Sequence, residues 1–226
     1  DDQSQLLKGL DGNKDQSYFL YALTQAQIRD ALFPIGELEK PKVRELASSV
    51  GFANHAKKDS TGICFIGERK FKTFLEQYLP AQPGKIRTTD GKVIGKHQGL
   101  MYYTIGQRKG IGLGGIKEAQ EAAWFVLYKD LKSNELVVGQ GTDHPDLYKS
   151  QLTAMQLTWV NGVKPIENKP YLAKTRYRQE DQKCTIAFVN NETIKIEFQL
   201  PQRAITPGQS VVLYDGDTCL GGGIIE

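Results

Sequence analysis

The chain changes the spacing of its apolar residues near Tyr78, and this change limits its fold more than any other feature. Up to about Tyr78 the apolar residues recur with the period of an α-helix. After it they form short β-type runs separated by glycine, proline and Asn/Asp turns. Helices followed by a long series of strands are typical of an α+β fold. We therefore expect a helical first part, a β-rich central domain and a C-terminal antiparallel β-barrel.

Capping residues and helix breakers mark four helices in the first part of the chain. Their expected limits are Asp15 to Ala22, Thr24 to the residues before Pro34, Pro41 to Gly51, and Glu68 to Pro80. Thr24 and Gln27 have the spacing of a capping box, in which each side chain binds a free backbone N–H of the first turn. The third helix has an apolar side that includes Leu46 and Val50.

Two groups of strands follow the helices. The central group is clearest at residues 124–128 and 136–138, which a turn at 132–134 joins. The second group consists of residues 152–160, 171–178, 184–189, 193–198, 210–214 and 219–225. Short strands at near-regular spacing predict a small closed barrel. The expected domains are residues 1–78, 79–145 and 146–226.

Composition excludes several classes of protein. The 226 residues are 39% hydrophobic and 24% charged, which is ordinary for a soluble globular protein. No apolar run approaches the roughly 18 residues that span a bilayer, so we expect no membrane partner. The net charge of +3 is small, so any nucleic-acid surface must come from local patterning. Three widely spaced cysteines and three scattered histidines indicate a reducing compartment and no metal site.

Cys64 lies in a setting that favours a reactive thiol. Gly62 and Gly67 flank it and allow a loop conformation, and four cations (Lys57, Lys58, Arg69 and Lys70) lie close in the sequence. Nearby positive charge favours the thiolate, which is the nucleophilic form. The alternative is a small buried side chain between Ile63 and Phe65. Cys184 and Cys219 lie in apolar strand patterns, so we expect both to fill the core.

The expected strand at 171–178 carries three cations. Because side chains alternate along a strand, Lys174, Arg176 and Arg178 should share one face and form an anion-binding ridge. The alternative is a solvated edge strand. Residues 110–115 match the dinucleotide pattern G-x-G-x-x-G, but no apolar strand precedes them and no clear helix follows, so we expect no nucleotide site there.

Residues 58–67, with Cys64 near their centre, resemble the catalytic-cysteine loop of the tRNA-specific 2-thiouridylases, the MnmA/TrmU family. The resemblance extends to residues 9–11, 14–20, 33–36, 99–100, 104–110, 174–178 and 221–223. Members of this family begin with a nucleotide-binding domain that has a Ser-Gly-Gly-x-Asp-Ser phosphate loop and a second catalytic cysteine. Neither motif occurs in this sequence, which therefore resembles the C-terminal portion of such an enzyme.

The resemblance implies specific roles for several residues. Cys64 would carry the persulfide intermediate, within a helical tail of the catalytic domain whose cysteine loop spans residues 57–68. Contacts to tRNA would come from Lys14, Asp15, Gln16, Arg176, Tyr177 and Gln209. The full-length enzyme would use ATP and Mg²⁺, held in the missing N-terminal domain, to adenylate C2 of the wobble uridine (U34). Sulfur from the persulfide would then give 2-thiouridine.

The resemblance also implies a cytoplasmic monomer that receives its sulfur from an upstream persulfide-relay protein, and a fragment that is inactive by itself. Two other functions are open at this stage. One is a noncatalytic tRNA-binding module with a buried Cys64. The other is a cysteine hydrolase in which His55 or His97 acts as the base for Cys64.

Overall fold

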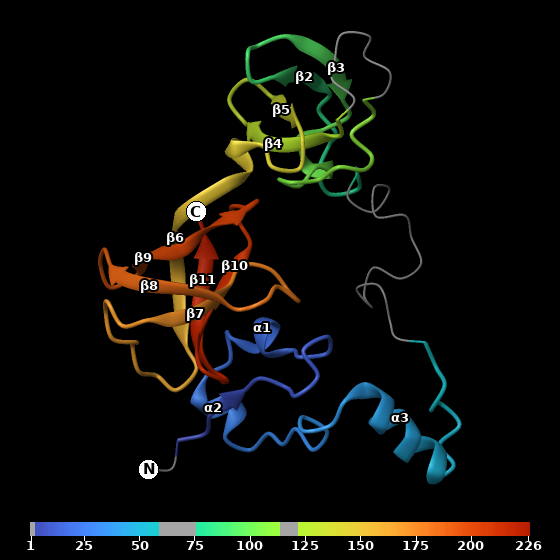
Figure 1. Cartoon of the computed structure of the whole chain (residues 1–226), viewed down its shortest axis with the longest axis vertical. Coiled ribbons are helices and arrows are strands. Elements are labelled where there is room, and N and C mark those ends of the chain that lie inside the picture. Colours follow the sequence, from blue (N-terminus) through green and yellow to red (C-terminus); the bar gives the residue numbers. More distant parts are fainter. Residues whose placement is uncertain (1–2, 59–75, 114–121) are drawn as a thin grey trace. The chain divides into compact units, whose positions relative to one another are not determined.

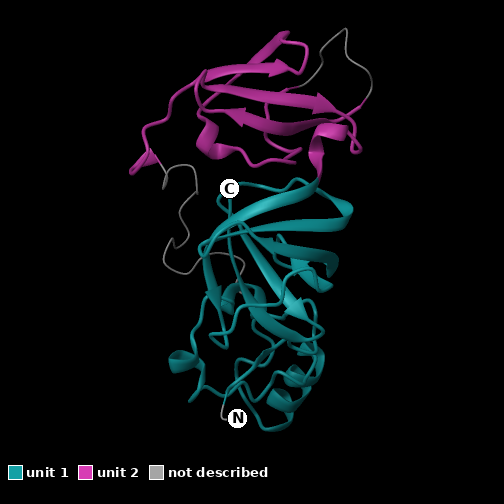
Figure 2. Ribbon diagram, turned by 90° about the vertical axis from the view of Figure 1, so that its left-hand side faces the viewer, with its two compact units in different colours: residues 1–58, 150–226 teal, residues 59–149 magenta. Residues whose placement is uncertain are grey.

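A computed structural model of the chain describes residues 3–58, 76–113 and 122–226. The chain divides into two compact units, Asp1–Lys58 with Ser150–Glu226 and Asp59–Lys149 (Figure 2). The first 58 residues thus group with the C-terminal strands, although more than 90 residues separate the two segments in the sequence. The division into three domains expected from the sequence stays a prediction.

Six strands of the first unit form a closed barrel, which confirms the α+β expectation (Figure 1). They are β6 (Tyr148–Trp159), β7 (Tyr171–Lys174), β8 (Gln182–Phe188), β9 (Thr193–Arg203), β10 (Ser210–Asp215) and β11 (Thr218–Ile225). Their order is β11-β10-β7-β8-β9-β6, and pairing of β11 with β6 closes the ring. The short β1 (Leu6–Leu7) pairs with the start of β11, Leu6 opposite Cys219.

Glycines make the closure of the barrel possible. A Cβ at Gly221 would meet the carbonyl oxygen of Thr158 in β6, and one at Gly222 would meet that of Val211 in β10. Because β11 has backbone neighbours on both sides, residues without a side chain let the three strands approach each other. Gly221 also has a φ of +131°, a conformation that few other residues adopt.

Alternation along the strands fills the barrel. In β9, Ile194, Ile196 and Phe198 are buried while Lys195 and Glu197 are exposed. Cys184 of β8 is 4% exposed and packs among the same apolar side chains, as expected from its strand pattern. The barrel interior is therefore a packed core.

The second unit is built on a four-stranded sheet. It contains β2 (Gly84–Thr88), β3 (Val93–His97), β4 (Trp124–Asp130) and β5 (Glu135–Gln140) in the order β3-β2-β5-β4, with two 3₁₀ turns at Leu100–Tyr102 and Pro145–Leu147. Asn134, with a φ of +53°, closes the expected turn between β4 and β5. The β2–β5 pair is parallel, so the sheet is mixed. The sequence did not predict this pairing.

The helices are shorter than their sequence patterns suggest. They are α1 (Ser17–Leu20), α2 (Gln25–Ile28) and α3 (Lys40–Ser49). The Thr24–Gln27 capping box is confirmed, but α1 begins after Gln16 instead of Asp15. Apart from a short helical end near Glu76, the fourth expected helix lies outside the described residues. No helix in the described ranges is long and apolar enough to cross a bilayer.

Candidate functional site

Three segments that are far apart in the sequence meet on the first unit. We call residues 13–19, 175–178 and 204–210 the three-segment surface. Gln16 Nε2 donates to Tyr177 Oη at 2.7 Å, which joins the first two segments across 161 residues of sequence. Arg176 Nη2 donates to the carbonyl oxygen of Ala204 at 2.7 Å, and Tyr18 Oη donates to that of Ser210 at 2.9 Å. These bonds bring all six predicted RNA-contact positions onto one part of the molecule.

The expected cationic ridge of residues 171–178 is wrong. Strand β7 ends at Lys174, and a turn follows. Thr175 N donates to Gln179 Oε1 at 2.7 Å instead of to a neighbouring strand, and Arg178 has a left-handed φ of +63°. Because strand geometry is lost after Lys174, the three cations do not share a face.

Each of the three cations has a different environment. Lys174 is buried, and its Nζ lies 3.9 Å from Asp15 Oδ2 and 3.7 Å from Asp181 Oδ1. Arg176 is half-buried, and this burial lowers the pKa of its guanidinium, with a smaller contribution from Arg203. Arg178 is exposed, and its Nε donates to the carbonyl oxygen of Asn13 at 3.1 Å. Of the three, Arg178 is the cation best placed to meet a phosphate.

Asp15 shapes the first segment from inside the protein. Its side chain is 6% exposed and accepts hydrogen bonds from Gly9 N, Ser17 N and Ser17 Oγ. The carboxylate thus holds the loop that precedes α1 and faces Lys174. Lys14 on one side is half-buried, and Gln16 on the other is exposed. The Asp15 side chain is thus turned into the protein, and its expected contact to RNA stays a prediction.

Gln209 lies in the third segment, on the turn between β9 and β10. Its backbone N–H donates to Thr206 O at 3.2 Å, and its carbonyl oxygen accepts from Ile225 N at 2.8 Å. Arg176 also donates to Thr206 Oγ1 at 3.4 Å, which ties this turn to the second segment. Gln209 is half-buried. Its two backbone hydrogen bonds fix its position at the end of the barrel.

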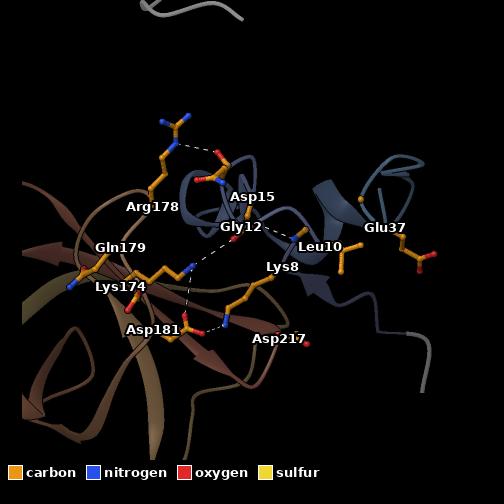
Figure 3. Close-up of a pocket in the computed structure, with 14 residues that line it drawn as sticks. Lys8, Leu10, Gly12, Asp15, Glu37, Lys174, Arg178, Gln179, Asp181 and Asp217 are labelled. Carbon is orange, nitrogen blue, oxygen red and sulfur yellow. Dashed lines mark hydrogen bonds and ion pairs between the residues drawn. The ribbon is translucent and has the colours of Figure 1, made fainter. Parts of the chain in front are cut away.

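A polar pocket of about 750 Å³ opens beside the three-segment surface (Figure 3). Its lining includes Asp15, Lys174, Arg178 and Asp181. Lys8 Nζ lies 2.7 Å from Asp181 Oδ2, and Lys174 lies near both Asp15 and Asp181. The charges of these two lysines are therefore balanced by carboxylates of the same pocket. We attribute to these ion pairs the fixed geometry of the neighbouring loop and turn.

Phe19 is a member of the three-segment surface that the sequence did not single out. Its ring is 56% exposed and its centroid lies 4.7 Å from that of Tyr177. In the helix expected between Asp15 and Ala22, Phe19 is one of several apolar residues, and the pattern does not indicate that it is the exposed one. Its exposure next to the polar residues 13–16 is the only signal, and that appears in three dimensions.

The described cysteines and His97 are not suited to nucleophilic chemistry. Cys184 and Cys219 are buried, and burial raises the pKa of each thiol to about 12. His97 is 1% exposed; its Nε2 lies 3.1 Å from Asn134 O and its Nδ1 accepts from Gly99 N. Both ring nitrogens are therefore occupied by backbone. Cys64 lies outside the described residues, and no group of metal-binding side chains occurs within them.

Comparison with known proteins finds similar sequences along the whole chain. Three family models match it in series: "tRNA methyl transferase HUP domain" at residues 1–68, "tRNA methyl transferase PRC-barrel domain" at 72–140, and "Aminomethyltransferase beta-barrel domain" at 149–225. The tRNA-specific 2-thiouridylase MnmA of Shewanella sp. (strain MR-7) is 58% identical over 226 residues, which are 100% of this chain and 61% of that protein. The enzyme of the same name from Thiobacillus denitrificans is 60% identical over 220 residues, 97% of this chain and 62% of its own. The chain thus spans less than two thirds of the length of these relatives.

Proposed function

This chain belongs to the tRNA-specific 2-thiouridylase MnmA family, and on that premise we propose that it acts in the transfer of sulfur to a uridine of tRNA. Its own part is to hold the RNA on the three-segment surface. The observation that carries this proposal is that hydrogen bonds join the three segments that contain Lys14, Gln16, Arg176, Tyr177 and Gln209. Neither the positions of these residues along the sequence nor the alternation of side chains in the strands predicts that they lie together.

The surface suits RNA because it combines exposed polar groups with a firm support. Arg178 and Lys14 would contact phosphates, which supply most of the affinity in RNA complexes and make it depend on salt. Gln16 and Tyr177 offer hydrogen-bonding groups at the same surface. Arg176 and Asp15 act as positioning residues, since each binds mainly protein backbone.

For the whole enzyme we propose the following reaction on the wobble uridine. ATP adenylates the C2 oxygen and releases pyrophosphate. The terminal sulfur of a persulfide on Cys64 attacks C2, and AMP leaves with the former oxygen. A second cysteine outside this chain then forms a disulfide with Cys64 as the S–S bond of the persulfide breaks. The described residues offer no cluster of side chains that could hold Mg²⁺.

The properties of the other cysteines support Cys64 as the sulfur carrier. A thiol with a pKa near 12 is almost wholly protonated at neutral pH, and both Cys184 and Cys219 are in that condition. Buried side chains also cannot receive sulfur from a protein donor. We further propose that this donor is a persulfide-carrying protein and that the enzyme works as a cytoplasmic monomer.

The decisive test uses the full-length enzyme with tRNA, ATP and a sulfur donor. Cys64→Ser should abolish formation of 2-thiouridine, measured by mass spectrometry of digested tRNA, because an oxygen cannot carry the persulfide. Affinity for tRNA should stay within a few-fold of the parent. Cys184→Ala and Cys219→Ala are the matched controls and should keep thiolation. Thiolation by the Cys64→Ser enzyme at a comparable rate would contradict the assignment.

The 226-residue chain by itself provides a second test. It should bind tRNA but should not convert ATP to AMP, since its sequence lacks the phosphate-loop motif. AMP above a no-protein control would show that a nucleotide site exists within this chain.

A further inference from the structure

The aromatic pair Phe19–Tyr177 lies on the three-segment surface, with Tyr177 packed against the core and Phe19 turned toward solvent. The two ring centroids are 4.7 Å apart with an angle of 43° between the planes. Phe19 keeps 56% of its surface exposed in this position. An apolar ring that is exposed and also held against a second ring offers a flat surface to a ligand.

Several contacts hold the pair in place. Tyr18 lies edge-on to Phe19 at 5.4 Å, is itself 7% exposed, and is fixed by its bond to Ser210 O. Tyr177 accepts the hydrogen bond from Gln16 Nε2 at 2.7 Å. Because both neighbours are fixed, little side-chain entropy remains to be lost when a ligand stacks on Phe19.

A cation lies next to this aromatic pair. The guanidinium carbon of Arg178 is 5.1 Å from the centroid of the Tyr177 ring. Its Nε is bonded to Asn13 O, and its left-handed backbone sets this direction. A left-handed backbone is uncommon for arginine, and residues in such conformations cluster at functional sites. A ring surface with an arginine at its side matches a base and its phosphate.

We propose that Phe19, supported by Tyr177, is the stacking site for one unpaired base of the tRNA, and that Arg178 contacts a phosphate next to that base. This inference rests on the proposed function, because it takes tRNA as the ligand. Recognition of single-stranded RNA commonly depends on bases splayed onto aromatic side chains. Stacking does not depend on base identity, so Phe19 would contribute affinity with little sequence preference.

The test measures binding of tRNA to the 226-residue chain by fluorescence anisotropy over a series of salt concentrations. Phe19→Ala should weaken binding about 5-fold to 100-fold, and the slope of log K against log[salt] should not change, since no charge is removed. Phe19→Trp should bind at least as well as the parent. Arg178→Ala should reduce the magnitude of the slope by about 1.

Two controls separate stacking from other effects. Phe19→Leu keeps an apolar side chain but removes the aromatic face, so it should weaken binding like Phe19→Ala even if the alanine variant folds poorly. Phe52→Ala removes a phenylalanine of similar exposure (60%) outside the surface and should leave binding unchanged. If the parent binds tRNA and Phe19→Leu binds equally well, the stacking site is wrong while the proposed function stands. If the parent does not bind tRNA, the proposed function itself fails.

Discussion

Helices α1, α2 and α3 all lie in the N-terminal stretch and all have apolar residues. Apolar residues of α1 and α2 pack against the barrel, but those of α3 are not buried. Tyr18 of α1, Tyr21 directly after it and Ile28 of α2 are buried against Val212, Tyr214 and Cys219 of the barrel. Helix α3 has no buried residue, and Leu46 and Val50 are 45% and 66% exposed. The longest helix described is thus the one with the least tertiary support.

The difference teaches that an apolar side does not by itself attach a helix to a core. The first pair has four residues per helix, too few for stability in isolation. They are held by side chains with partners in the barrel, such as Tyr18 and Gln25, whose Nε2 donates to Val160 O at 3.0 Å. Four predictions test this contrast.

The largest effect should come from Lys174, which links β7 to the loop before α1. Lys174→Met keeps the length of the side chain but leaves the buried Asp15 carboxylate without its nearby cation. We expect a loss of about 3–5 kcal/mol in the free energy of unfolding, measured by urea denaturation at neutral pH. Lys183→Met, at an exposed lysine of β8, is the control. Equal midpoints for the two variants would show that the Lys174–Asp15 contact does not support this region.

Ile28→Ala should have the next largest effect. Ile28 is 4% exposed, at the end of α2. Removing buried methyl groups should cost about 2–3 kcal/mol, visible as a lower urea midpoint with an unchanged m-value. A change in m would instead indicate that α1 and α2 detach as a separate unit.

Cys219 should make stability depend on alkaline pH. Burial raises the pKa of its thiol from 9.0 in the unfolded chain to about 12 in the folded protein. The thiol therefore contributes its full stability below pH 9 and loses it as the pH rises toward 12, because the unfolded chain releases the proton first. Cys219→Ala should make the fall in unfolding free energy over this interval shallower by up to about 1.4 kcal/mol per pH unit. Parallel curves for parent and variant would contradict the raised pKa.

The smallest effect should come from α3. Leu46→Ala should change the unfolding free energy of the 226-residue chain by less than about 0.5 kcal/mol, because the side chain is 45% exposed and belongs to no apolar cluster of the described residues. Thermal unfolding followed by circular dichroism would measure this. A loss similar to that of Ile28→Ala would remove the contrast between the two regions.

The candidate site was predictable in part. Its six positions came from the resemblance to a known family, since local patterns around Lys14 and Gln209 are commonplace. The one pattern-based argument, alternation of Lys174, Arg176 and Arg178, failed because Gln179 captures the N–H of Thr175 and ends the strand. Phe19 had no signal in the sequence, because its exposure depends on where a four-residue helix is attached.

The sequence by itself determined the features that depend on neighbours along the chain. The Thr24–Gln27 capping box, Pro41 in the first turn of α3, the turn at Asn134 and the alternation in β9 all follow from local sterics and hydrogen bonding. The tertiary structure alone decided which apolar sides are covered, which cation is buried, and that Gln16 meets Tyr177. These outcomes depend on contacts between residues more than 100 positions apart, such as the 161-residue separation of Gln16 and Tyr177. The spacing of apolar residues in one segment shows which of its faces is apolar, but it does not show which distant segment will contact that face.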